Sequence, residues 1–320
     1  MNRYLHWLGR ICALLALIFF CKEFWESFKE IPGFNLDLGS VLAFALSVVY
    51  SAITFAGTAL VAMILLRGGG IPITFPQSYE IIGRSQIGKY LPGNIFHHVG
   101  QVALGSQKGI PAEKSVVSIW GHTAVIVIAG SSVAYIGFLL DASGWSSSVA
   151  LATRAALTGG VTKFLIVVVA CLVLSLFFKK TRAWIGRSQG FFSPRSLLLS
   201  YSIYLLIFLL YGIVCAFILS FFWSVDLYQS WYFLASGYAL AWVLGFVVPG
   251  APSGIGIRES VLLLVFSPVL GQGNTLGLAV IMRISAALGD LLTFMIASRL
   301  HTGSIDSSDA QEHSEDFAGT

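Results

Sequence analysis

Charged side chains are scarce in this 320-residue chain, and their scarcity excludes most soluble proteins. Asp, Glu, Lys and Arg make up 11% of the residues, whereas a soluble globular domain carries about 25%. Hydrophobic residues make up 56%, and the mean hydropathy is +0.82. This balance rules out an ordinary water-soluble enzyme.

Cysteine is also rare, and the motifs of nucleotide and acyl-transfer chemistry are missing. The four cysteines lie in or beside apolar runs and form no Cys-x-x-Cys pair, so we interpret them as packing residues (Cys12, Cys21, Cys171 and Cys215). The chain has no Gly-Lys-Ser/Thr phosphate loop and no Gly-x-Ser-x-Gly elbow, and Gly254-Ile-Gly256 lacks the third glycine of a dinucleotide loop. Basic stretches carry no interleaved aromatic residues. We therefore expect no cofactor, no metal, no ATP-driven pump and no nucleic-acid partner.

Long apolar runs are what the chain has in abundance. Several approach or exceed the 18 residues or so that cross a hydrocarbon core of about 30 Å. They predict membrane spans at roughly 5–22, 39–66, 115–140, 157–178, 196–222, 231–248 and 275–298. The predicted fold class is all-α: a polytopic helical membrane protein with seven to eight transmembrane helices, in which residues 1–300 form one domain.

The distribution of charge predicts an orientation. The loop from Lys179 to Arg195 carries five basic residues and no acid, so we expect it on the cytoplasmic side together with the N-terminus and residues 67–114. Residues 301–320 carry five acids and neither Lys nor Arg, which predicts a disordered, dispensable tail. Seven spans would place this tail outside, and an eighth over 256–272 would place it inside.

Two segments fit neither a span nor a simple loop. Residues 85–109 are too polar to span, and residues 249–273 begin with glycines and prolines before a helix of about 12 residues that should end at Pro268. Each follows one long run and precedes another. We interpret both as Pro-Gly-initiated re-entrant or broken helices in two pseudo-repeated halves, with amphipathic surface loops as the alternative.

The few ionisable residues inside these segments are the candidate site. Arg258 and Glu259 are adjacent, so on a helix they diverge by about 100° and cannot pair along one face. Glu259 suits the start of a helix, which leaves Arg258 for a phosphate or another carboxylate. Arg283 and Asp290 each need a partner elsewhere, and we expect Arg283 to pair with Glu259. The alternatives are an interfacial arginine that snorkels and a structural ion pair.

Backbone amides freed at a Pro-Gly helix start suit a phosphate oxygen. The remaining substrate-binding candidates surround these starts: Arg84, Lys89, Pro92, Gly93, Asn94 and Gln101 in the first segment, and Pro249, Gly250, Gly254 and Gly256 in the second. His97 and His98 should diverge on a helix, and no acid or cysteine lies at ligand spacing, which argues against a metal. We interpret His122 as an interhelical hydrogen-bond donor, with a proton relay as the alternative.

Two motifs carry a resemblance to a known family. LPGNIFHHVGQVALGSQKGI at 91–110 and VPGAPSGIGIRESVLLL at 248–264 resemble the two signatures of the lysylphosphatidylglycerol-synthase transmembrane-region family, and Arg283 fits an arginine that usually follows. The sequence departs from the family near Gln101, often an arginine, and near His122, often an acid. The resemblance implies an inner-membrane lipid-handling protein without the soluble aminoacyl-transferase domain.

Three functions remain open at this stage. The first is a non-enzymatic lipid translocator for an anionic phospholipid or a polyprenyl-phosphate-linked lipid. In it, Arg258, Glu259 and Arg283 converge on a polar cavity that faces Pro92-Gly93. The second is a membrane transferase that uses Glu259 or Asp290 as its base. The third is a non-catalytic subunit that holds an envelope glycan-assembly enzyme, with the basic 179–195 loop as its docking site.

Overall fold

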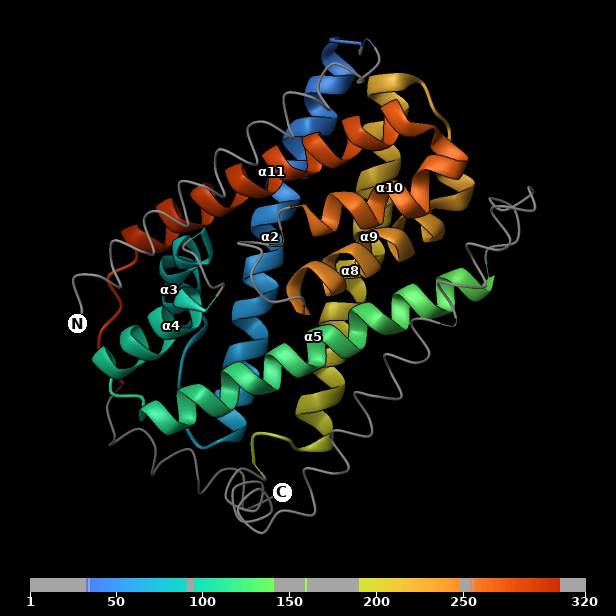
Figure 1. Ribbon diagram of the computed structural model, residues 1–320. Coiled ribbons are helices and arrows are strands. Elements are labelled where there is room, and N and C mark those ends of the chain that lie inside the picture. The colour runs from blue at the N-terminus through green and yellow to red at the C-terminus, as the bar shows by residue number, and fades with distance from the viewer. Residues whose placement is uncertain are drawn as a thin grey trace, which may run out of the picture.

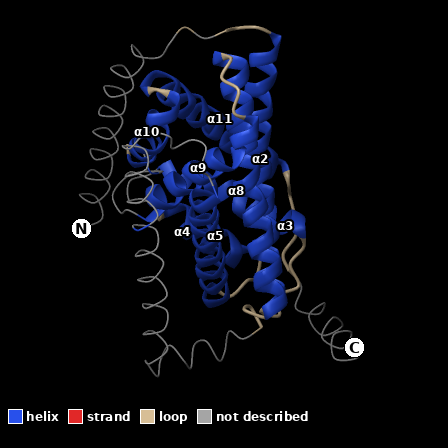
Figure 2. Cartoon of the chain, turned by 90° about the vertical axis from the view of Figure 1, so that its right-hand side faces the viewer, coloured by secondary structure: helices blue, strands red, loops and turns tan. Residues whose placement is uncertain are grey.

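The computed structural model describes residues 35–90, 95–140, 190–247 and 256–305, together with Gly33, Gly159 and Gly254. Within these ranges every regular element is a helix, and no strand occurs (Figure 2). The predicted spans at 5–22 and 157–178, the 179–189 part of the basic loop, and residues 306–320 lie outside the described part of the chain.

Four long apolar helices confirm four of the predicted spans. They are α2 (Leu38–Gly68), α5 (Ala112–Leu140), α8 (Pro194–Trp223) and α11 (Gln272–Arg299). The shorter elements are α3 (Phe75–Ser85), η1 (Gln86–Tyr90), α4 (Phe96–Gln107), η2 (Tyr228–Ser230), α9 (Trp231–Val247) and α10 (Ile257–Leu270). With four helices that are long and apolar enough to cross a bilayer, the protein is a multi-pass membrane protein.

Large apolar side chains point outward from these helices, as a lipid environment requires. Leu46 and Ile53 on α2, Leu198 and Leu206 on α8, and Leu291 on α11 are all exposed. The inward faces instead carry small residues that let helices approach closely. For example, a Cβ at Gly289 of α11 would collide with the Ser51 side chain of α2.

The long helices share one basic end. The Lys114 ammonium at the start of α5 donates to the Gly69 carbonyl at the end of α2 over 2.9 Å. Gly68 and Gly190 bring the end of α2 against the start of α8. We call this the basic end, because it carries the basic residues of the helix termini and their connections (Arg67, Lys108, Lys114, Arg195 and Arg299).

The opposite, acidic end carries Asp37 and Asp226. There the Asn35 amide donates to the Phe222 carbonyl at 3.0 Å, which joins the start of α2 to the end of α8. The side chain of Trp223 packs against Gly277 near the start of α11. Asp37 itself caps α2, since its carboxylate accepts the Ser40 N–H at 2.8 Å.

Helices α3, η1 and α4 form a hairpin that begins and ends at the basic end. Before it, Arg67 Nε donates to the Ile73 carbonyl, and after it Lys108 contacts Thr302 just beyond α11. At its tip, Lys89 reaches Asp290 of α11. Asp290 lies nine residues before the end of α11, about 14 Å along the axis and so near mid-depth. The inward arm starts at Phe75, earlier than the predicted Ser85.

Helices α9 and α10 form the matching hairpin from the acidic end. Figure 1 shows the α3–α4 pair (teal) and the α9–α10 pair (orange) entering the space between α11 and α5 from opposite sides. At 17 residues, α9 is at the lower limit for a span, so it acts as the inward arm of this hairpin.

The prediction that the outward arm α10 ends at Pro268 is wrong, because the helix continues to Leu270. A proline there forfeits only one helical hydrogen bond, close to the helix end.

Residues 301–305, which follow α11 and which we call the strap, connect α11 to the first hairpin. The Ile305 amide donates to the Lys108 carbonyl at 2.9 Å, and Gln77 Nε2 donates to the Gly303 carbonyl at 3.2 Å. The prediction of a tail over 301–320 therefore begins too early, because residues through Ile305 are bound. Through these contacts the strap, and with it the C-terminal end of α11, lies at the basic end together with residues 67–114.

Candidate functional site

A polar cavity of about 140 Å³ lies where the two hairpin tips meet. Seven of the ten helices of the described residues contribute its polar side chains: Ser51, Thr54 and Thr58 from α2, Gln86 and Lys89 from η1, His97 from α4, Tyr204 and Tyr211 from α8, Tyr238 from α9, Arg258 from α10 and Asp290 from α11. Polar side chains that converge in a mostly apolar helical bundle are typical of a ligand site. We call it the main cavity.

Arg258 projects into the main cavity from the first turn of α10. Its guanidinium lies 5.5 Å from the centroid of the Trp242 ring, and its stem packs against Gly245 of α9. Its Nε is buried without a hydrogen-bond partner, and the side chain forms no ion pair with any described residue. Arg258 therefore offers a positive charge and an open donor to whatever enters the cavity.

Glu259 points away from Arg258, as the helical geometry predicted. One carboxylate oxygen accepts the Gly256 N–H at 2.7 Å, which caps α10, and the other accepts Arg283 Nε at 2.7 Å. The predicted Glu259–Arg283 pair is confirmed. It joins α10 to α11 beside the main cavity, although neither residue lines the cavity.

Asp290 anchors the tip of the first hairpin. Its carboxylate lies 2.7 Å from Lys89 Nζ and also accepts the Tyr90 hydroxyl. Lys89 further contacts the Phe55 ring, 5.0 Å from its centroid. Asp290 has a distant partner, as we expected. The structure identifies this partner as Lys89, which the sequence analysis assigned to the polar residues around Pro92-Gly93.

Two glycines shape the start of α10. Gly254 and Gly256 have φ values of +70° and +84°, which side chains on L residues rarely adopt. A Cβ at Gly254 would lie 2.7 Å from the Gly245 carbonyl and 3.0 Å from Arg258 Nε. These glycines let α9 and α10 close around Arg258. The other predicted backbone elements, Pro92, Gly93, Asn94, Pro249 and Gly250, lie outside the described residues.

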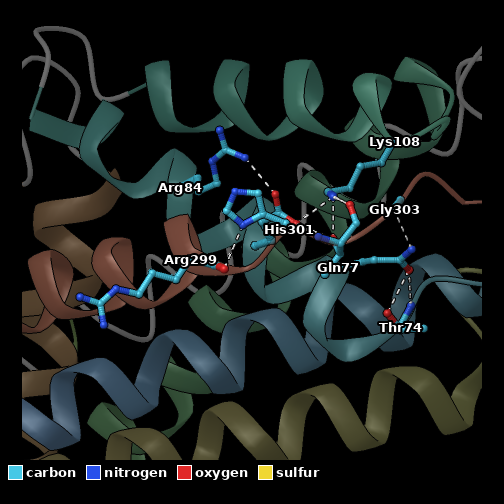
Figure 3. A network of polar contacts seen from close by, with 9 residues as sticks. Thr74, Gln77, Arg84, Lys108, Arg299, His301 and Gly303 are labelled. Atoms are coloured by element: carbon cyan, nitrogen blue, oxygen red, sulfur yellow. Dashed lines mark hydrogen bonds and ion pairs between the residues drawn. The ribbon is translucent and has the colours of Figure 1, made fainter.

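Arg84 belongs to a different polar cluster, which is shown in Figure 3. It donates to Glu80 at 2.9 Å, is 42% exposed in its side chain and does not line the main cavity. Glu80 is buried and also binds Lys108 at 2.8 Å and the Thr302 hydroxyl.

Burial alone would raise the pKa of Glu80. The hydrogen bonds from Lys108, Thr302 and Arg84 outweigh it and lower this pKa to about 2. Glu80 is therefore ionised at neutral pH and holds α3, α4 and the strap together. The structure therefore does not bring Arg84, a predicted substrate-binding residue, to the main cavity, because it pairs with this structural carboxylate.

Gln101 lines a second, smaller cavity of about 20 Å³ that it shares with His122. These are the two positions at which the sequence departs from the family signature. The prediction that the rings of His97 and His98 diverge is wrong: at the start of α4 their centroids are 3.8 Å apart. No metal-binding group of three His, Cys, Asp or Glu side chains occurs within the described ranges.

A model of the lysylphosphatidylglycerol synthase transmembrane region matches residues 7–292, most of the chain. The chain belongs to this family. No curated protein and no solved structure matches it. Membership makes it a membrane protein of lipid or envelope biosynthesis.

Several site residues of this family member were not predicted from its sequence. Tyr90, Tyr211, Tyr238 and Trp242 are neutral, and only charged residues stand out against an apolar sequence. Tyr211 and Tyr238 stack with centroids 4.4 Å apart across α8 and α9. A signal did exist for Tyr90, since it directly follows Lys89 in a polar stretch.

Proposed function

We propose that this protein is a lipid translocator that passes an anionic, phosphate-bearing head group through the main cavity and catalyses no chemical reaction. The observation that carries the proposal is Arg258, a guanidinium with a buried, unpartnered Nε in a polar cavity at mid-depth. An arginine without a counter-ion is costly in such a place unless a ligand supplies the negative charge.

Among the described residues, the charged side chains at and beside the main cavity balance one another except for one positive charge. Lys89 is offset by Asp290, and Arg283 is offset by Glu259. Arg258 remains, and its planar fork suits the two oxygens of a phosphate group. A single excess positive charge matches a phosphodiester, which carries one negative charge.

The two hairpins supply the means of movement. They enter from opposite ends and meet at the main cavity, an arrangement typical of transporters with inverted halves. Displacing one hairpin at a time would expose Arg258 to one side and then to the other, while the lipid tails stay in the hydrocarbon.

Orientation follows from charge. The basic end should face the cytoplasm, which puts the N-terminus, residues 67–114 and the strap on that side of an inner membrane. The 190–195 part of the basic loop lies at the same end, where an envelope glycan-assembly enzyme could dock. A transferase is less well supported, because Asp290 is the sole carboxylate among the described residues that line the main cavity, and Lys89 already neutralises it.

Reconstitution tests the proposal. Vesicles of phosphatidylethanolamine and phosphatidylglycerol, with a trace of head-group-labelled fluorescent phosphatidylglycerol, are bleached from outside by dithionite. We expect the protein to move the inner-leaflet probe outward and Arg258→Gln to slow this by roughly tenfold or more, since charge-assisted hydrogen bonds are lost. Arg299→Gln, at the exposed end of α11, is the matched control and should keep the unmutated rate.

Two outcomes would contradict this function. In the first, Arg258→Gln elutes as a folded protein and moves the probe as fast as the unmutated chain. In the second, the unmutated protein moves no anionic lipid, which would favour the scaffold role.

A further inference from the structure

Three buried or half-buried histidines and a glutamine lie close together at the junction of α4 and α5. The Nδ1 atom of His97 is buried without a hydrogen-bond partner, whereas the side chain of His98 bonds to that of Gln101 and the ring of His122 bonds to the Ser118 backbone. Buried polar groups almost always find a partner in a folded protein. The open nitrogen of His97, at the end of this row of polar side chains, therefore needs an explanation.

The three imidazoles form a row. The ring centroids of His97 and His98 are 3.8 Å apart, those of His98 and His122 are 6.2 Å apart, and Gln101 lies beside His98. His97 lines the main cavity, whereas His122 and Gln101 line the small cavity. The row thus connects the two cavities.

The small cavity can hold water. Its volume of about 20 Å³ exceeds the roughly 10–15 Å³ that one water molecule needs. Ser115 and Ser118 also line it, so a water there would have several polar partners. Ser115 lies in the first turn of α5, next to Lys114 at the basic end. The lining of the cavity therefore runs along α5 from its first turn to His122.

We propose that His122, His98 and His97 form a proton relay from the basic end to the main cavity, which couples lipid movement to a proton gradient. The proposal rests on the proposed lipid translocation. A neutral imidazole takes a proton from a hydronium ion on one ring nitrogen, which leaves water behind, and releases the other ring proton to the next acceptor. Each ring ends neutral, in its other tautomer, and a ring flip restores it.

The relay has an acceptor at its end. His97 and Asp290 line the same cavity, and Asp290 is the sole acid among the lining residues in the described part of the chain. A proton that leaves His97 for Asp290 turns the carboxylate into a neutral acid and removes the charge that holds Lys89. When the main cavity opens toward the acidic end, Asp290 gives this proton to water there, and the restored carboxylate binds Lys89 again. Because that ion pair fixes the tip of the first hairpin, proton arrival is linked to hairpin movement.

The charged groups around the row leave the rings free to exchange protons. None of the three histidines forms an ion pair with a carboxylate of the described residues. The groups on the surrounding elements are Lys89 on η1, Asp290 on α11, Arg258 on α10, Glu80 and Arg84 on α3, Lys108 after α4, and Glu113 and Lys114 on α5. Glu80, Arg84 and Lys108 are engaged with one another, and Asp290 is engaged with Lys89.

The test uses the full chain in the vesicles described above, with a pH-sensitive dye inside. Lipid movement is measured at equal pH and under a gradient of about two pH units, and proton uptake is read at the same time. We expect the gradient to speed lipid movement severalfold and proton uptake to accompany it. His122→Asn, whose amide replaces Nδ1 but cannot carry a proton, should abolish both responses and keep the rate at equal pH.

His98→Asn repeats the test at a less buried position, in case His122→Asn does not fold. His301→Gln, at an exposed histidine beyond α11, should respond like the unmutated protein. The relay is overturned if the unmutated protein moves lipid at equal pH but ignores the gradient, or if the folded relay variants keep the full response. If no lipid moves under any condition, the proposed function fails, and histidine-dependent proton uptake then decides the relay by itself.

Discussion

At the scale of single residues, two arginines near the main cavity have opposite roles. Arg283 is paired with Glu259 at 2.7 Å, and the two side chains are 18% and 25% exposed. Arg258 has no such partner among the described residues and packs on Trp242. Removing Arg283 leaves a carboxylate without its cation, whereas removing Arg258 takes away an uncompensated charge.

We therefore predict that stability and function separate at these two positions. Arg283→Gln should lower the free energy of unfolding by roughly 1.5–3 kcal/mol, the usual contribution of a hydrogen bond to a charged group. Arg258→Gln should leave stability unchanged or raise it while lipid movement is lost. Thermal unfolding in detergent micelles measures the first effect. Equal destabilisation by the two variants would contradict the assignment of Arg258 as the ligand-binding arginine.

The sequence predicts which residues need partners better than it predicts the partners. Glu259 and Arg283 are 24 residues apart, on consecutive helices, so their pairing could be inferred from the cost of isolated charges. Lys89 and Asp290 are about two hundred residues apart. Their pairing depends on how deeply the first hairpin enters, and no local pattern encodes that depth.

At the scale of elements, the strap after α11 holds the first hairpin at its base. Thr302 donates to Glu80 through both its amide and its hydroxyl, and Lys108 Nζ donates to the Thr302 carbonyl at 2.7 Å. The acidic composition of 301–320 predicted disorder, but a few polar residues can be ordered by a buried carboxylate and a lysine that composition does not reveal.

We predict different outcomes for two truncations. A chain that ends at Ile305 should match the full chain in melting temperature and lipid movement. A chain that ends at His301 should be less stable by about 1–3 kcal/mol, because Glu80 and Lys108 lose hydrogen bonds. Thr302→Val removes the same hydroxyl without creating a new terminus, and Ser304→Ala is its control. Equal melting temperatures for both truncated chains would show that the strap contributes nothing.

The difference in stability between the chains that end at Ile305 and at His301 should depend on pH, and the sign of this dependence can be predicted. The pKa of Glu80 is lowered from an ordinary 4.5 to about 2, so its ionised form is the one that stabilises the fold. This contribution is fully present above about pH 4.5 and is lost as the pH falls toward 2. The gap in stability between the two truncated chains should narrow across that range.

For whole helices, too, the sequence predicts some features and misses others. The long apolar runs of α2, α5, α8 and α11 were predicted because length and composition alone decide a span. The inward arms of the hairpins were not recognised. Helix α3 precedes the re-entrant segment that was predicted to start at Ser85, and α9 was predicted as a span over 231–248, whereas both form one arm of a hairpin.

At the scale of the whole molecule, the ends of the two hairpins should lie on opposite sides of the membrane. In a cysteine-free background, we predict that Pro76→Cys and Ser106→Cys react with an impermeant thiol reagent from the cytoplasmic side. Gln272→Cys should react from the other side. All three positions are exposed. Labelling of Pro76→Cys and Ser106→Cys from opposite sides would mean that the first hairpin crosses the bilayer.

Helix α11 holds both hairpins at once, through Arg283 and Asp290. These residues are two helical turns apart, about 10 Å along the axis. Opening one hairpin breaks one ion pair and leaves the other intact, whereas opening both breaks two. The helix therefore links the two hairpins: opening both at once, which would form a continuous aqueous pore, is the least favourable arrangement. If the proposed lipid movement occurs, we expect the permeability barrier of the membrane to survive it.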